Sequence, residues 1–208
     1  MAITTYAELQ AAAANWLVRA DLTARIPEFI ALAEARLNRV MRARLAETEV
    51  ALSATLGSRT VSLPAGFTEP LRLWIVRPDG RDELPFQEAG LVSVSMVRGE
   101  PRHWTVDGVS VAFDRPCDQA YGFTLRMLKA FVLSDAVPTN ALLSGFPDLY
   151  LFATLSEAGP FLRDSELAGV FEQKLGRALQ EANAKDARSR RSGLLVTDLI
   201  QMTLGSRR

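Results

Sequence analysis

The chain has few of the residues that carry most enzyme chemistry. It contains one cysteine, Cys117, and one histidine, His103, among 208 residues. A single thiol excludes an internal disulfide, so we expect a reducing compartment. Zinc sites need clustered Cys and His ligands, which two such residues do not supply. The sequence has no G-x-x-x-x-G-K-[ST], G-x-G-x-x-G or G-x-S-x-G motif. We therefore expect no catalytic site, no cofactor and no metal.

The sequence also lacks long apolar runs and an excess of basic charge. No run approaches the roughly 20 apolar residues that cross a bilayer, and the N-terminus has no secretory pattern. We expect a soluble, cytosolic protein without a membrane partner. Lys plus Arg equals Asp plus Glu, 24 each, so the net charge is zero. This balance argues against wholesale coating of nucleic acid, and it gives copies of the chain little mutual repulsion.

Residues 1–47 predict two helices. Thr5 and Glu8 have the spacing of a capping box at the start of the first. Asp21 or Thr23 is expected to cap the second, with Pro27 in its first turn. Apolar residues recur at helical spacing and are expected in the core: Leu9, Ala12, Ala13, Trp16, Leu17, Phe29, Ile30, Ala33, Leu37, Val40 and Met41. The polar residues of the second helix, Glu34 and Asn38 among them, fall largely off this face.

Residues 48–132 predict a small antiparallel β-sheet or sandwich inserted between helices. Turn signals separate the strand candidates, which are residues 49–55, 59–63, 71–77, 102–106, 109–113 and 121–131. Asp107-Gly108 between two apolar segments predicts a two-residue hairpin loop. Trp74 and Trp104 are expected on the packed face. Residues 87–98 fit a short helix or a loop.

Residues 133–190 predict a C-terminal helical hairpin that completes the bundle. Pro147 starts its first helix, Gly159-Pro160 weakens or bends the end of that helix, and Asp164 or Ser165 caps the second. The second helix carries an apolar stripe of Leu167, Val170, Phe171, Leu175, Ala178, Leu179 and Ala182. Residues 191–208 predict a flexible, extended arm. The fold class is therefore α+β, a helical bundle of N- and C-terminal helices with an inserted β-sheet or sandwich and an extended C-terminal arm.

Two sets of residues are candidates for contacts with partners. The first contains the arginines Arg36, Arg39, Arg42, Arg188, Arg190 and Arg191. For those of the second helix a solvated or salt-bridged face is the simpler interpretation, with contact to an acidic partner or to passing DNA as the alternative. The three in the tail fit interface anchoring and unbound charge equally. The second set is the apolar segment Leu194, Leu195, Val196, Leu199 and Ile200, which is expected to dock on a neighbour.

Other chemically active side chains are expected to be structural. His103 lies beside Trp104 in a predicted strand, away from any nucleophile motif. The acidic pairs Asp82-Glu83 and Asp164 with Glu166 lie in turn and cap contexts, where solvated or capping roles are favoured over catalysis.

Several segments, taken in order, resemble the adaptor proteins of the head-to-tail connector of tailed phages. Residues 4–9, 16–17, 21–23 and 26–39 (IPEFIALAEARLNR) resemble the start of these adaptors. Residues 63–67 (LPAGF) resemble their LPADF element, with Gly66 where Asp is usual, and residues 99–104 (GEPRHW) resemble their GRPRYYT strand entry. Residues 133–135, 138–140, 142–143 and 147–151 resemble the segment that leads into their C-terminal helices. The resemblance covers about residues 4–193.

This resemblance implies a structural subunit that performs no reaction. Such adaptors form a ring, usually of twelve copies, beneath the portal of a tailed phage or a phage-like gene transfer particle, with the helical bundle around the DNA channel. The implied partners are the portal protein, neighbouring adaptor copies, a downstream stopper or tail protein, and passing double-stranded DNA bound without sequence specificity. The implied location is the virion neck, assembled in the bacterial host cytoplasm. A tail-completion or stopper protein, and a small nucleic-acid-binding regulator, remain as alternatives.

Overall fold

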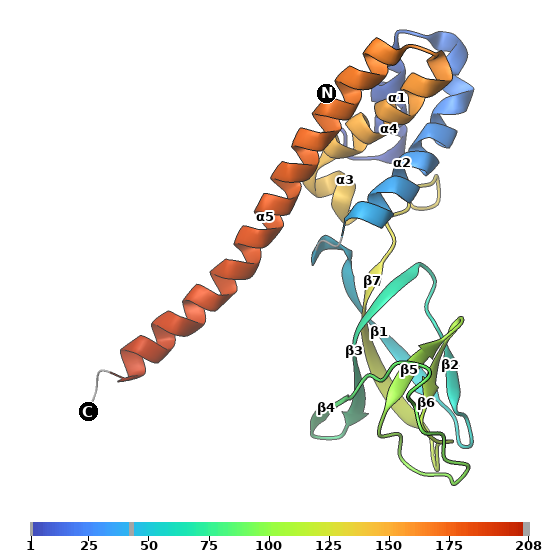
Figure 1. The fold of residues 1–208 in the computed structure, drawn as a ribbon, viewed down its shortest axis with the longest axis vertical. Helices are drawn as coiled ribbons and strands as arrows, with labels where there is room; N and C mark the ends of the chain where they lie inside the picture. Colours follow the sequence, from blue (N-terminus) through green and yellow to red (C-terminus); the bar gives the residue numbers. More distant parts are fainter. Residues whose placement is uncertain (1, 42–43, 206–208) are drawn as a thin grey trace. The chain divides into compact units, whose positions relative to one another are not determined.

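The computed structural model describes residues 2–41 and 44–205, and at residues 20, 44, 186 and 188–205 it describes the backbone alone. The chain forms two compact units (Figure 1). A helical unit comprises Met1–Leu45 and Phe131–Arg208, and a β unit comprises Ala46–Ala130. In sequence the β unit is inserted between helices, so the predicted α+β class with an inserted small antiparallel β part is confirmed.

The first half of the helical unit contains α1 (Tyr6–Leu17), the 3-10 helix η1 (Ala20–Arg25) and α2 (Ile26–Val40). The predicted capping box of α1 is confirmed. The Glu8 backbone N–H donates to the Thr5 hydroxyl at 3.3 Å, and the Thr5 backbone N–H donates to the Glu8 carboxylate at 3.1 Å. This reciprocal pair satisfies two backbone donors that the first turn leaves free.

The start of α2 differs from the prediction. Pro27 lies in its first turn, as expected, but neither Asp21 nor Thr23 caps it. The N-cap is Arg25, which makes no side-chain cap bond. The reason is that η1 places the preceding residues in helical backbone, whereas a side-chain cap needs an extended residue immediately before the helix.

The second half contains α3 (Ala141–Gly145), α4 (Pro147–Leu162) and α5 (Ser165–Gly205). Helix α4 lies at the centre of the unit and contacts each of the other four α-helices. Pro147 lies in the first turn of α4, as predicted, and the helix continues through Pro160 to Leu162. Asp164 caps α5, because its carboxylate accepts a 2.9 Å hydrogen bond from the Leu167 backbone N–H.

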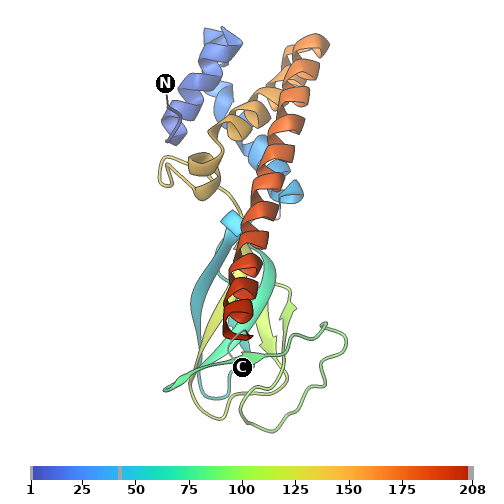
Figure 2. The same ribbon diagram turned by 90° about the vertical axis from the view of Figure 1, so that its left-hand side faces the viewer.

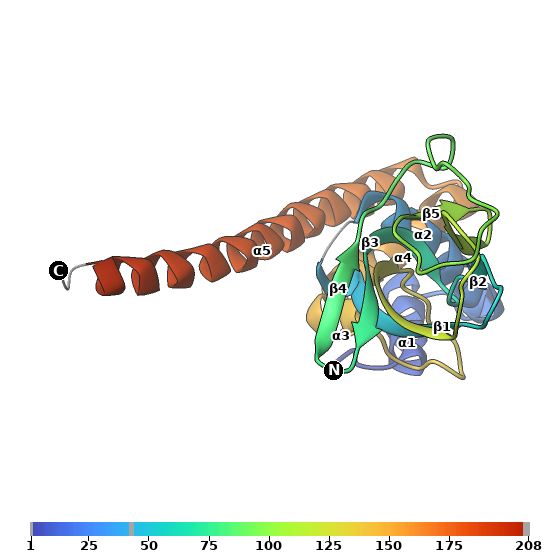
Figure 3. The same ribbon diagram turned by 90° about the horizontal axis from the view of Figure 1, so that it is seen from below.

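Helix α5 is longer than predicted. It spans 41 residues. Figure 2 shows it as one uninterrupted helix, and Figure 3 shows that it continues past α1–α4. The expectation of an extended backbone is therefore corrected for residues 191–205, which are helical. The physical reason is that a helix already stabilised by packing on α4 gains one hydrogen bond for each added residue, and no proline interrupts residues 165–205.

Three residues predicted in the helical core are largely exposed. Trp16 is 47% exposed, Val40 53% and Val170 46%. Trp16 is at the end of α1 and reaches the surface, where its ring lies 5.9 Å from that of Phe152 and 6.1 Å from that of Phe171. Most of the other predicted core positions are buried, including Leu9, Phe29, Ile30, Leu37 and Leu175.

The β unit contains two antiparallel sheets. The strands are β1 (Glu47–Ala54), β2 (Thr60–Ser62), β3 (Phe67–Arg77), β4 (Gly80–Leu84), β5 (Trp104–Asp107), β6 (Ser110–Phe113) and β7 (Tyr121–Lys129). One sheet has the order β1-β7-β3-β4 and the other β2-β6-β5. Side chains from both sheets form one buried cluster. In it the Phe113 and Phe123 rings stack at 4.7 Å, and the buried Trp104 indole N–H donates to the Leu84 carbonyl at 3.0 Å.

Three details of the β unit go beyond the prediction. Asp82 and Glu83, expected in a turn, lie in the edge strand β4. A charged strand is tolerated there because its charged side chains are exposed, and charges on an edge strand protect the sheet edge from pairing with other chains. The β5–β6 hairpin is confirmed, but its loop is Gly108-Val109, because Asp107 pairs with Ser110. Residues 87–98 form no helix or strand and are a loop.

Candidate interaction surfaces

Glu34 of α2 is buried, although the sequence pattern places it on the polar side of the helix. Only 8% of the residue is exposed. Its carboxylate accepts 2.6 Å hydrogen bonds from the Leu133 backbone N–H and from the Tyr150 hydroxyl. The Asn140 side chain donates to the same hydroxyl at 3.1 Å. Burial raises the pKa of Glu34 above its usual value, and the two hydrogen bonds oppose this shift.

Asn38, one turn further along α2, holds the same segment of chain. Its amide nitrogen donates to the Phe131 carbonyl at 2.9 Å, and its amide oxygen accepts from the Phe131 N–H at 2.8 Å. One side chain thus satisfies both backbone groups of a residue outside any helix or strand. Together Glu34 and Asn38 fix residues 131–133 against α2, which is a structural role.

Arg36 is bound within the helical unit. Its guanidinium makes a two-pronged ion pair with Glu172 of α5, and it lies 3.5 Å from the Glu157 carboxylate of α4. Ser156 joins the cluster by donating to Glu172. The pKa of Glu172 is lowered, first by the hydrogen bond from Arg36 and then by that from Ser156. A shallow hollow of about 310 Å³ borders this cluster, so Arg36 joins three helices and also lines a surface.

Among the other candidate arginines, the structure describes the side chain of Arg39 alone. Arg39 is exposed on α2, and Arg42 lies outside the described residues. Arg188, Arg190 and Arg191 lie on the helical backbone of α5, and their side chains lie outside what the structure describes. The same holds for the proposed docking segment of Leu194, Leu195, Val196, Leu199 and Ile200. The partner contacts of these residues are thus predictions from the sequence. Of the predicted contact residues, the structure describes the side chains of Arg36 and Arg39 alone.

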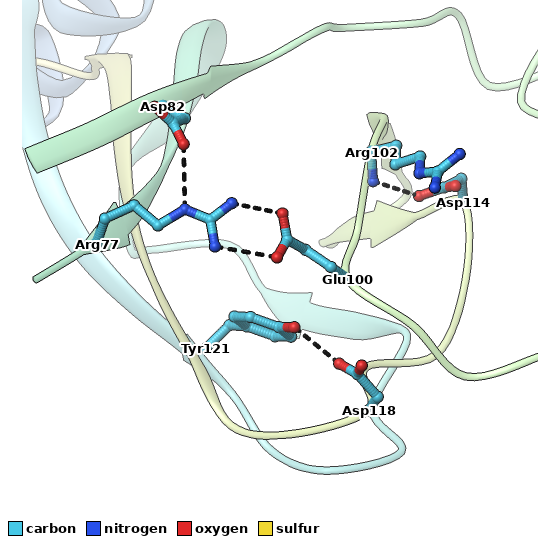
Figure 4. A network of polar contacts seen from close by, with 7 residues as sticks. All are labelled: Arg77, Asp82, Glu100, Arg102, Asp114, Asp118 and Tyr121. Atoms are coloured by element: carbon cyan, nitrogen blue, oxygen red, sulfur yellow. Dashed lines mark hydrogen bonds and ion pairs between the residues drawn. The ribbon is translucent and has the colours of Figure 1, made fainter.

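The charged residues of the β unit form ion pairs that fix its loops (Figure 4). The Arg77 guanidinium on β3 binds both oxygens of Glu100, one at 3.0 Å, and also Asp82 at 3.1 Å. The hydrogen bond from Arg77 holds the pKa of Glu100 below its usual range. Glu100 follows the loop of residues 87–98, so this pair anchors one end of that loop.

Asp114 and Asp118 act on neighbouring loops of the same unit. The Asp114 carboxylate accepts a 2.9 Å hydrogen bond from the Arg102 backbone N–H, and Asp118 accepts one of 2.7 Å from the Tyr121 hydroxyl (Figure 4). Asp114 also accepts at 3.3 Å from the His103 backbone N–H. These carboxylates are occupied by internal hydrogen bonds.

The loop between β4 and β5 exposes a set of apolar side chains. Leu91 is 72% exposed, Met96 88% and Val97 74%. Two backbone hydrogen bonds tie the loop down, from Ser95 N–H to the Asp114 carbonyl at 2.8 Å and from Gly99 N–H to the Pro116 carbonyl at 2.9 Å. An anchored loop with exposed apolar side chains is suited to contact with another protein.

Among the described residues, no group of three or more Asp, Glu, His or Cys side chains could hold a metal ion. None of the helices in the described part of the chain combines the length and apolarity that a membrane span requires.

Comparison with known proteins shows the family to which the chain belongs. No curated protein matched the chain. The family model described as SU10 adaptor protein matches residues 4–198, which span both the helical unit and the β unit. The resemblance noted from the sequence segments points the same way. The chain therefore belongs to the SU10 adaptor protein family, a family of phage head–tail adaptors.

Proposed function

We propose that this protein is the adaptor subunit of a phage neck, which forms a ring beneath the portal, joins head to tail and lines the DNA channel. The observation that carries the proposal is the family match over residues 4–198, since it runs from the start of α1 into the C-terminal part of α5 and includes the β unit, rather than covering one shared motif. Family membership supports a structural component of the virion. The ring, its twelve copies and the channel lining are our extension of it.

The charges of the helical unit are compatible with a channel that DNA traverses. A strongly basic lining would retain DNA, because each neutralised phosphate adds affinity. Here Arg36 is neutralised by Glu172 and Glu157, and the whole chain carries no net charge. We propose that Arg39, and Arg42 three residues later in the sequence, contribute the few cationic contacts that passing DNA meets.

Helix α5 is suited to reach neighbouring proteins. At about 1.5 Å per residue, its 41 residues span about 60 Å. We propose that Arg188, Arg190 and Arg191 anchor its C-terminal part on an acidic surface, and that the segment Leu194 to Ile200 docks on the portal or on an adjacent copy. Many modest contacts repeated around a ring gain strength through multivalency.

Four regions carry these roles in our proposal. Residues 1–47 and 133–190 supply the bundle, residues 48–132 supply the β part that meets a downstream stopper or tail protein, and residues 191–208 supply the arm. We place the assembled protein in the virion neck, after assembly in the bacterial host cytoplasm.

Reconstitution with a portal tests the proposal. The full chain is mixed with the portal protein encoded in the same genome, and the mixture is studied by native mass spectrometry and electron microscopy. We expect little assembly of the chain alone and a ring on the portal. A chain that never co-migrates with the portal contradicts the proposal, whereas a chain that binds only after a different adaptor is present is a stopper. Tight, steeply salt-dependent DNA binding in a filter assay would favour a nucleic-acid-binding regulator.

A further inference from the structure

The chain passes between the helical unit and the β unit twice. The first crossing lies between Leu45 and Ala46, and the second lies between Ala130 and Phe131. Units of one chain that are joined by short connections commonly move relative to each other. A few residues at the connections then absorb the change in φ and ψ. The hydrogen bonds of the backbone identify one such residue at the second crossing.

The β unit holds the chain up to the N–H of Ala130. Lys129, the last residue of β7, pairs with Phe67 of β3, and the Ala130 N–H donates to the Gly66 carbonyl at 2.8 Å. A peptide group is planar and rigid. This hydrogen bond therefore fixes the whole peptide between Lys129 and Ala130 on the β unit.

Helix α2 holds the chain from the N–H of Phe131 onward. The Phe131 N–H donates to the Asn38 amide oxygen at 2.8 Å, and the Phe131 carbonyl accepts from the Asn38 amide nitrogen at 2.9 Å. The Leu133 N–H donates to the Glu34 carboxylate at 2.6 Å. The side chains of Phe131 and Leu133 are buried, and neither belongs to the buried cluster of the β unit. The peptide between Ala130 and Phe131 is therefore fixed on the helical unit.

Ala130 thus joins a peptide fixed on one unit to a peptide fixed on the other. The only bonds that rotate between two rigid peptide groups are the N–Cα and Cα–C bonds of the residue that joins them. We infer that Ala130 is the pivot of the second crossing, so that the β unit swings relative to the helical unit through φ and ψ of this one residue. Alanine suits the position, because a single methyl group restricts the backbone less than a branched side chain does.

The first crossing limits the motion to a swing about one line. Glu47, the first residue of β1, pairs with Leu128 of β7, so the chain enters and leaves the β unit on neighbouring strands. Two attachment points side by side define an axis, and rotation about that axis is the motion that they leave free. This hinge goes beyond the proposed function, because it adjusts the β unit to any partner while each unit keeps its own packing.

Substitutions of Ala130 test the pivot without changing the buried core of either unit. Ala130→Gly enlarges the φ and ψ range of the residue, whereas Ala130→Val adds a branched Cβ that narrows this range. Ala136→Gly is the matched control, since it makes the same change at an exposed residue outside any helix or strand, later in the helical unit.

The readout is the distance between two spin labels on the full chain. They are placed on Ala35→Cys of α2 and Ser53→Cys of β1, both exposed, and wild-type chain measures any labelling of the buried Cys117. We expect the width of the distance distribution, measured by double electron–electron resonance, to increase about twofold in Ala130→Gly. It should decrease in Ala130→Val and stay unchanged in Ala136→Gly. Equal widths for Ala, Gly and Val at position 130 overturn the inference, as does equal broadening by Ala136→Gly.

Asn38→Ala tests whether α2 confines the pivot to one residue. It removes both hydrogen bonds to Phe131, so that Phe131 rotates as well, and it should broaden the distribution beyond that of the wild type. Arg39→Ala changes the next residue, whose side chain is exposed, and should leave the width unchanged. An Asn38→Ala protein that is folded by circular dichroism and keeps the wild-type width overturns the inference. If this variant does not fold, the Ala130 series alone decides. None of these measurements involves a portal, so their outcome is separate from that of the proposed function.

Discussion

The Tyr150 hydroxyl of α4 donates a 2.6 Å hydrogen bond to the Glu34 carboxylate of α2, although the two residues are 116 positions apart in sequence. The same carboxylate accepts the Leu133 backbone N–H. A buried carboxylate with two donors and no cation among the residues bonded to it is stabilised by hydrogen bonding alone. It therefore fixes α2, α4 and the segment after β7 relative to one another within the helical unit.

Removal of the Glu34 acceptor should destabilise the helical unit. Glu34→Leu leaves the Leu133 N–H and the Tyr150 hydroxyl without this acceptor, and we expect a loss of about 2 kcal/mol in the free energy of unfolding. Glu34→Gln retains an oxygen at the same place and should lose much less. Urea denaturation of the three proteins measures the difference, and equal stability of the Leu and Gln variants would contradict this role.

The pH dependence of the same residue follows from its raised pKa. The folded state holds the Glu34 proton more tightly than the unfolded state. The resulting stability is fully present below the unfolded pKa and is lost as pH rises through the folded pKa. Wild-type protein should therefore lose stability with rising pH relative to Glu34→Gln, which does not titrate. Unfolding of both proteins across about pH 4 to 8 checks this, and a constant difference would contradict it.

Asn38→Asp is an isosteric test of the two hydrogen bonds between the Asn38 side chain and the Phe131 backbone, which we call the clamp on Phe131. Asn38→Asp replaces the amide donor by an oxygen that faces the Phe131 carbonyl, and we expect a loss of about 2 kcal/mol. Asn183→Asp makes the same change at an exposed position of α5 and should alter stability far less. Thermal unfolding at neutral pH compares them, and similar shifts in the two variants would argue against the clamp.

At Gly159, α4 lies too close to Ala168 of α5 to leave room for a side chain. A Cβ added there would lie 2.6 Å from the Cβ of Ala168 and 2.8 Å from its Cα. Gly159→Ala must push the helices apart, and we expect a loss of about 2 kcal/mol. Gly169→Ala meets no atom within 4 Å and should gain about 0.5–1 kcal/mol from helix propensity. Urea midpoints that move in the same direction for both variants would refute this prediction.

Arg36 and Arg39 should differ in their effect on stability. Arg36→Gln removes the pair with Glu172, and because that pair is partly exposed we expect a cost of about 0.5–1 kcal/mol at neutral pH. The lowered pKa of Glu172 means that the stabilisation is present above its unfolded pKa and is lost as pH falls through the folded pKa. The cost should therefore shrink in acid. Arg39→Gln is the control, and an equal or larger loss for it would contradict this assignment.

Local signals in the sequence predicted the element boundaries that depend on near neighbours. Each of these features depends on residues that lie close together in the sequence. They are the capping box of Thr5 and Glu8, the cap that Asp164 provides to α5, and the β5–β6 hairpin. Edge strand β4 was missed because its charged residues have low strand propensity, and only pairing with β3 makes it a strand. The caps at Asp21 and Thr23 were mispredicted for a related reason, since a 3-10 helix competed for the same residues.

The sequence by itself determined the α+β class, the inserted β part and the family resemblance, because periodicity, caps and motif order are properties of short segments. The tertiary structure decided which side chains are enclosed. It buried the polar Glu34, exposed the apolar Trp16 and Val18, and bound Arg36 to Glu172. Burial depends on what residues distant in sequence bring to the same place, and a buried carboxylate is tolerated only where distant donors meet it.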